Sequence, residues 1–127
     1  MGGYTNITTG ALRILYEARA SAREIIAYAM LTRYHNDEEH PARCWVSAQM
    51  ASETLGMTPD GFAKALNGLT RKTFAHGGGY VPVLTKVSDG HNGRAAVYND
   101  NAYAVATLRD PRQVARRNQR ATSFQQL

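Results

Sequence analysis

The first clear pattern of apolar residues predicts a helix from about Ser21 to Tyr34. Side chains recur there at the three- and four-residue spacing that places them on one face of a helix. The residues expected to face inward are Ile25, Ile26, Ala29, Met30 and Arg33. Ser21 precedes them and has the hydroxyl of a typical N-cap residue. Upstream, residues 9–16 are apolar but form a short run, so a helix and an extended segment are both open there.

Two more helices are expected, separated by a very short turn. The first starts at Ser47 and ends at Gly56, a residue type that commonly ends helices. The second starts at Thr58, which caps it, and continues through Pro59 and Asp60, which suit a first helical turn, to about Lys72. The residues expected to face inward are Met50, Ala51, Thr54 and Leu55 in the first helix and Phe62, Ala65, Leu66 and Leu69 in the second. Two helices joined this tightly are typical of a helix-turn-helix.

Shorter β-prone segments surround these helices. Residues 35–41 are polar and end in proline, which predicts a loop, and residues 43–46 predict a short strand. After a loop at residues 76–79, one strand is expected over residues 80–87, with Pro82 at an edge or a bulge. The turn-forming residues 88–93 and a second strand over residues 94–98 complete a β-hairpin. A last short helix is expected from Asn101 to Leu108.

This order of elements predicts a mainly α fold with a small β-hairpin (α+β), the arrangement of a winged helix-turn-helix. The residues that carry this resemblance are Trp45-Val46-Ser47, the turn Leu55-Gly56-Met57-Thr58, Phe62 with Ala65-Leu66, and residues 90–98. In them the chain resembles the helix-turn-helix domains of bacterial plasmid and phage replication initiators and regulators. We therefore expect an N-terminal segment over residues 1–20, a winged-helix domain over residues 21–108 and a basic C-terminal tail over residues 109–127.

The net charge of +5 is concentrated in the C-terminal half of the chain. Residues 1–70 carry six Lys and Arg against seven Asp and Glu, whereas from Arg109 onward five arginines face only Asp110. Clustered cations gain counterion release on a polyanion, which indicates a nucleic-acid partner. A tail that merely keeps the protein in solution would have the same composition.

The resemblance implies that residues 58–72 form the recognition helix of a DNA-binding protein. Its outward-facing candidates are Lys64 and Asn67 for base edges and Arg71 and Lys72 for phosphates. The hairpin candidates are Lys86, His91, Asn92 and Arg94, although a solvated hairpin tip would also be this polar. The candidates in the tail are Arg116, Arg117 and Arg120. Related recognition helices commonly open with basic or hydroxyl residues, so Asp60-Gly61 departs from the pattern and leaves open that the hairpin and tail dominate binding.

The expected function is therefore sequence-specific binding of double-stranded DNA, by a regulator or replication accessory of a mobile element. The alternative is a protein-interaction module on the same fold, such as an oligomerising subunit or an inhibitor of host nucleic-acid machinery. A homodimer would double the DNA contacts of one small module. No arrangement of residues indicates an enzyme or a cofactor site, and no apolar run is long enough for a membrane span.

Three other signals are weaker. His35, His40 and Cys44 lack the spacing of a compact metal site, so no metal is expected and Cys44 is expected in the core. A single cysteine also fits a reducing, cytoplasmic location. Aromatic side chains could in principle stack on bases, but most occupy apolar-periodic positions and are expected to pack inside. These residues are Tyr16, Tyr28, Tyr34, Trp45, Phe62 and Phe74.

Overall fold

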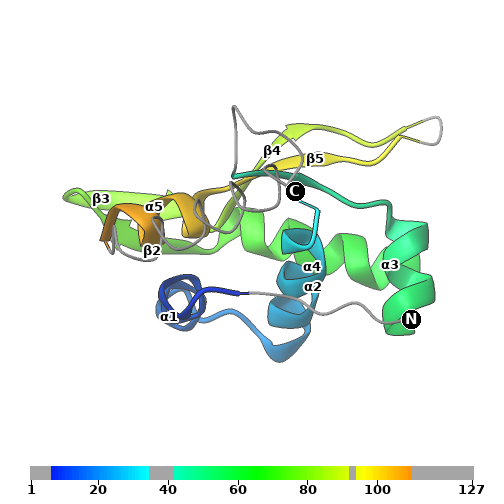
Figure 1. Cartoon of the computed structure of the whole chain (residues 1–127), viewed down its shortest axis with the longest axis horizontal. Coiled ribbons are helices and arrows are strands. Elements are labelled where there is room, and N and C mark those ends of the chain that lie inside the picture. The colour runs from blue at the N-terminus through cyan, green and yellow to red at the C-terminus, as the bar shows by residue number, and fades with distance from the viewer. Residues whose placement is uncertain (1–6, 35–41, 92–93, 110–127) are drawn as a thin grey trace, which may run out of the picture.

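The computed structural model describes residues 7–34, 42–91 and 94–109, and these ranges form a mixed α+β fold (Figure 1). The helices are α1 (Thr9–Glu17), α2 (Ala22–Thr32), α3 (Ala48–Leu55), α4 (Pro59–Arg71) and α5 (Asn101–Arg109). The strands are β1 (Arg43–Trp45), β2 (Thr73–His76), β3 (Gly79–Pro82), β4 (Leu84–Ser88) and β5 (Val97–Asp100). Within the described ranges, every helix is too short or too polar to cross a lipid bilayer.

Hydroxyl side chains start four of the helices. Thr8, Ser21, Ser47 and Thr58 each accept a hydrogen bond from a backbone N–H of the first turn that follows. At the other end of α3, Gly56 has a φ of 75°, and one residue, Met57, separates it from Thr58, the cap of α4. The expected starts of α2, α3 and α4 and the tight turn are thus confirmed. Residues 9–16, for which the sequence allows either a helix or an extended segment, belong to the helix α1.

A three-stranded antiparallel sheet brings together strands that are far apart in the sequence. Its order is β1-β5-β4, with Trp45 opposite Val97 and Lys86 opposite Tyr98. Strands β4 and β5 form the expected hairpin, although both strands start a few residues later than expected. The short strand before α3 and the helix after the hairpin are also confirmed.

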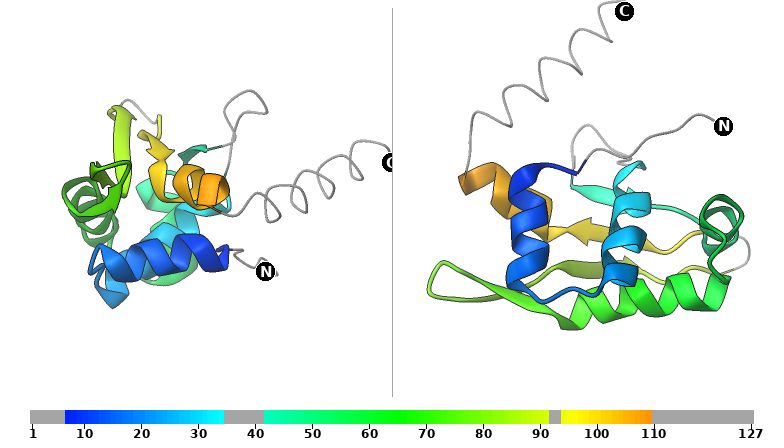
Figure 2. Two further views of the ribbon diagram at one scale, coloured as in Figure 1. Left: turned by 90° about the vertical axis from the view of Figure 1, so that its left-hand side faces the viewer. Right: turned by 90° about the horizontal axis from the view of Figure 1, so that it is seen from below.

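The expectation of one strand over residues 80–87 is wrong. Strands β2 and β3 pair as a separate hairpin around Gly77 and Gly78, so residues 76–79 are its tight end rather than an open loop. The chain leaves this hairpin at Val83, which is fully buried and donates its N–H to the Lys72 carbonyl. The Val83 carbonyl accepts from the backbone N–H groups of Asn101 and Ala102, so this residue joins the end of α4 to the start of α5. The β2–β3 hairpin extends beyond the end of α4 (Figures 1 and 2).

Two helices, α2 and α3, turn a different face to the core than the sequence predicts. The inward face of α4 is confirmed, because Phe62, Ala65, Leu66 and Leu69 are all buried. In α3, Ala51 is buried but Met50 and Thr54 are exposed, so the expected face is wrong for those two. In α2, the buried side is formed by Glu24, Ala27, Tyr28, Met30, Leu31 and Thr32, while Ile26 and Arg33, both expected to face inward, are exposed.

Polar contacts made by α2 account for its rotation. The Tyr28 hydroxyl donates to both carboxylate oxygens of Asp100, at 2.8 and 2.7 Å, and Asp100 also accepts from the N–H of Tyr103 in the first turn of α5. Because Asp100 is fully buried, these bonds offset the cost of removing a carboxylate from water. The core around them also takes in Cys44, as expected, and Ile14 and Leu15 of α1, which packs against α5 (Figure 2).

Candidate nucleic-acid interface

A groove of about 550 Å³ lies between α4, the start of α3 and the β4–β5 hairpin, and we call it the α4 groove. Its apolar side is formed by buried residues of the core, among them Phe62, Leu66 and Tyr98. Its polar side chains come from both elements: they include Asn67 from α4 and Lys86, Asp89, His91 and Arg94 from the hairpin. Four of the sequence candidates therefore line one depression, although they come from distant parts of the chain.

The outer face of α4 carries Lys64, Asn67 and Arg71, which follow one another at spacings of three and four residues. Asn67 is half-buried in the α4 groove, and Arg71 is exposed in the last turn of the helix. The Lys64 side chain is 77% exposed, and its ammonium lies 3.2 Å from the Asp60 carboxylate. Asp60 thus partly neutralises the cation one turn further along α4.

On the hairpin, Lys86 lies at the inner wall of the groove. Its ammonium is 3.2 Å from the Asp89 carboxylate and 5.8 Å from the centroid of the Tyr98 ring. Burial raises the pKa of the Tyr98 hydroxyl above its usual 10.0, and the positive charge of Lys86 opposes that shift. Tyr98 therefore stays neutral under ordinary conditions.

The end of the hairpin is closed by backbone contacts between His91 and Arg94. The Arg94 N–H donates to the His91 carbonyl at 2.9 Å, and Nδ1 of His91 lies 3.3 Å from the Asp89 carbonyl oxygen. Both side chains are exposed. The turn thus holds an imidazole and a guanidinium at the rim of the α4 groove.

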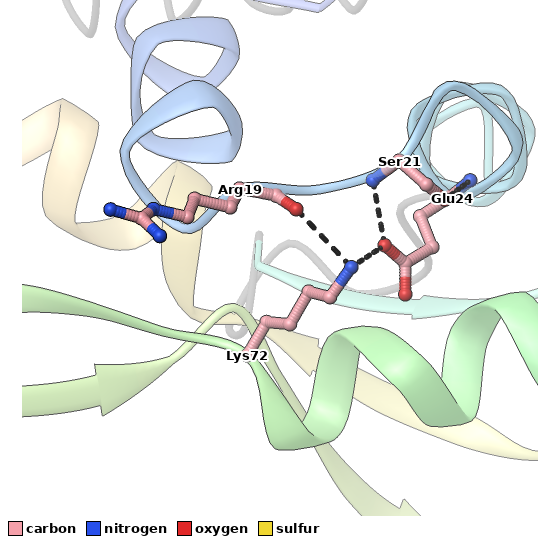
Figure 3. A network of polar contacts seen from close by, with 4 residues as sticks. All are labelled: Arg19, Ser21, Glu24 and Lys72. Carbon is pink, nitrogen blue, oxygen red and sulfur yellow. Dashed lines mark hydrogen bonds and ion pairs between the residues drawn. The ribbon is translucent and has the colours of Figure 1, made fainter.

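Lys72 does not join the other candidates. Figure 3 shows its ammonium directed toward the connection between α1 and α2, where it donates to the Arg19 carbonyl at 3.2 Å and to the Glu24 carboxylate. The same carboxylate oxygen accepts from the Ser21 N–H at 2.7 Å. These contacts tie the end of α4 to the start of α2, so we remove Lys72 from the candidate interface and assign it a structural role.

The surroundings of Glu24 keep its carboxyl group ionised. Burial alone would raise its pKa, but the hydrogen bonds from Lys72 and Ser21 and the charge of Lys72 outweigh burial and leave the pKa below the usual 4.5. Gly68 of α4 makes room for this group, because a Cβ at that position would overlap the Glu24 Oε2 atom. Gly68 lowers the helix propensity of α4, but it leaves space for the partly buried ion pair between Glu24 and Lys72.

Arg109, the first cation of the expected tail, also has a structural position. Its guanidinium donates to the Ala75 carbonyl at 2.7 Å and lies 3.4 Å from the Glu17 carboxylate, joining α5 to β2 and α1. The other candidates lie outside the described residues: Asn92, Arg116, Arg117 and Arg120, together with His35 and His40.

Two residues at the edge of the α4 groove are not among the interface candidates that the sequence predicts. Ser47 and Gln49 belong to its lining because α3 begins there. The N-cap pattern at Ser47 could have pointed to them, since it locates a helix start beside the turn to α4.

Comparison with known proteins gives no relative to set beside this geometry: no protein-family model, curated protein or solved structure matches the chain.

Proposed function

We propose that this chain is a winged-helix protein that binds double-stranded DNA, with α4 as the recognition helix and the β4–β5 hairpin as the wing. The order α2, β1, α3, α4, β4, β5 and the sheet order β1-β5-β4 support this proposal. The β2–β3 hairpin is an insertion between α4 and β4. The chain resembles helix-turn-helix domains of plasmid and phage replication initiators and regulators. We therefore propose that it is a regulator or replication accessory of a mobile element.

One observation carries the proposal: Asn67 of α4 lines the same groove as Lys86, His91 and Arg94 of the hairpin. A helix that enters the major groove of DNA is flanked by a phosphate backbone, which suits cations on a neighbouring hairpin. Asn67 has an amide that can pair with both groups of an adenine edge. Lys64 would then be a second candidate for a base edge, and Arg71 and the hairpin cations would hold phosphates.

A salt titration of duplex binding tests the proposal. A protein that neutralises several phosphates loses affinity steeply as the salt concentration rises. Arg94→Gln should weaken binding to every duplex and reduce this salt dependence, whereas Asn67→Ala should change the preferred sequence in a selection from a random duplex library. Arg13→Gln is the matched control, because Arg13 is also exposed, in an ion pair on α1, and the variant has the same charge change. Absence of binding to any duplex would reject the proposal.

The alternative function is a protein-binding module on the same fold. It is favoured by the pair between Asp60 and Lys64, which leaves the first turns of α4 without net positive charge. A partner that co-purifies with the protein and resists both nuclease and high salt would support this alternative.

A further inference from the structure

A second surface of the molecule gathers aromatic side chains beside the α4 groove. It is a pocket of about 490 Å³ whose lining includes Tyr34, Trp45, Met50, Arg94 and Val97, and we call it the Trp45 face. Trp45 and Met50 are 40% and 47% exposed, which is unusual for two large apolar residues that lie together. Core packing was the expected role of both Trp45 and Tyr16, and the expectation is wrong for both, because Tyr16 is 83% exposed.

The strand β1 explains why Trp45 faces outward. Successive side chains of a strand alternate between its faces, so Cys44 and Val46 enter the core and Trp45 points away from it. The backbone of Trp45 is held by its pairing with Val97 and by its backbone N–H, which donates to the Tyr34 carbonyl at 3.2 Å. An indole held by a sheet with one side open loses little conformational entropy when a planar group stacks on it.

Among the described residues, two cations lie at or next to the Trp45 face. Arg94 lines the pocket, and the Arg33 guanidinium lies 5.8 Å from the centroid of the ring of Tyr34, which is also a lining residue. No acidic side chain contributes to this pocket within the part of the chain that the structure describes. Aromatic rings interleaved with cations suit nucleotides, which combine a planar base with a phosphate, better than they suit an apolar protein segment.

We propose that the Trp45 face binds unpaired nucleotides of single-stranded DNA. A base stacks on Trp45 beside Tyr34, and Arg94 and Arg33 hold the adjoining phosphates. Arg94, Val46 and Ser47 line both this pocket and the α4 groove, so the two surfaces meet. Where a duplex occupies the α4 groove, a single strand leaving it can cross Arg94 to the Trp45 face. Only the passage of a strand from the α4 groove to the Trp45 face rests on the proposed duplex binding.

Tryptophan fluorescence reads out this site directly, because the sequence contains one tryptophan. The full chain is titrated with an oligothymidylate of about 12 nucleotides, with a blunt duplex, and with the same duplex carrying a single-stranded extension. We expect the single strand and the extended duplex to quench the fluorescence, and the blunt duplex to leave it nearly unchanged. We also expect the extended duplex to bind more tightly than the blunt one.

Substitutions separate stacking from charge. Trp45→Leu should weaken binding of a labelled oligothymidylate by on the order of ten-fold, and Trp45→Phe should recover most of that loss, because a ring is restored. Tyr80→Leu is the matched control, since Tyr80 is another exposed aromatic residue, at 78%, on the β2–β3 hairpin. It should bind the oligonucleotide like the unmodified protein. Circular dichroism confirms that each variant is folded, and if Trp45→Leu is not, the quenching titration and Trp45→Phe decide.

Several results would overturn the proposal. One is fluorescence that does not respond to the single strand, and another is unchanged affinity in Trp45→Leu. A blue shift that grows with protein concentration in the absence of nucleic acid would show that a second copy of the chain covers this face instead. If the single strand quenches the fluorescence but no duplex binds, only the proposed function is rejected. If a duplex binds but the single strand does not quench the fluorescence, only this inference is rejected.

Discussion

The ammonium of Lys72, the residue that follows α4, bonds the carboxylate of Glu24, whereas Lys64 within α4 extends into solvent beside Asp60. Two lysines that look alike in the sequence therefore have different roles. Lys72 joins α4 to α2 in a partly buried ion pair, and Lys64 is available to a ligand.

Lysine-to-methionine substitutions should separate these roles. Lys72→Met leaves the Glu24 carboxylate buried without its cation, so we expect the free energy of unfolding to fall by about 2 kcal/mol, with little change in duplex affinity. Lys64→Met should change stability by less than about 0.5 kcal/mol and weaken duplex binding. Urea unfolding and a duplex titration of both variants measure the two effects. Equal destabilisation by both substitutions would contradict the structural role of Lys72.

Gly68→Ala tests the close approach of Glu24 to α4. In the middle of an exposed helix, replacing glycine with alanine stabilises by about 1 kcal/mol. Here the new methyl group would displace the Glu24 carboxylate, so we expect destabilisation instead, measured by thermal unfolding. Combining Gly68→Ala with Glu24→Ala should restore part of the loss, because the overlap is then removed. A stabilised single variant would show that the Glu24 carboxylate moves aside at little cost.

The ion pair should make stability depend on acid. The pKa of Glu24 is lower in the folded protein than its usual 4.5, so the unfolded chain binds the proton more readily. The stabilisation from this group is therefore complete at pH values above 4.5 and is lost as the pH falls below that value toward the folded pKa. Glu24→Gln should be less stable than the unmodified protein at about pH 7, and the difference should shrink at about pH 3. Urea unfolding across this range measures it, and a difference independent of pH would argue against ionised Glu24.

Removing the acidic group at the start of α4 should strengthen duplex binding. Asp60→Asn frees Lys64 from its ion pair and removes a charge that phosphate repels, so we expect affinity to rise by about two- to five-fold at low salt. Glu53→Gln is the matched control, because Glu53 is exposed on α3 and the charge change is the same. Equal gains in both variants would indicate a general effect of net charge rather than a local one.

Only part of the candidate site could be predicted from the sequence. The spacing of Lys64, Asn67 and Arg71 follows from the helical period, and the polar hairpin tip follows from its glycines and turn residues. The sequence predicts the same role, phosphate contact, for Arg71 and Lys72, and the structure separates them. Arg71 ends α4 and is exposed, but the backbone of Lys72 is extended, and this turns its side chain toward α2.

The sequence by itself determined where the helices α2, α3 and α4 begin, the tight turn at Gly56 and the buried face of α4. These features depend on hydrogen bonds and spacings within a few residues, and such local interactions are encoded locally. Only the tertiary structure decided the rotation of α2, the outward position of Trp45 and the separate β2–β3 hairpin. Each of these depends on partners distant in the chain, such as Asp100 for Tyr28, Val97 for Trp45 and the start of α5 for Val83. A local pattern cannot specify contacts whose free energy arises only when distant segments have packed together.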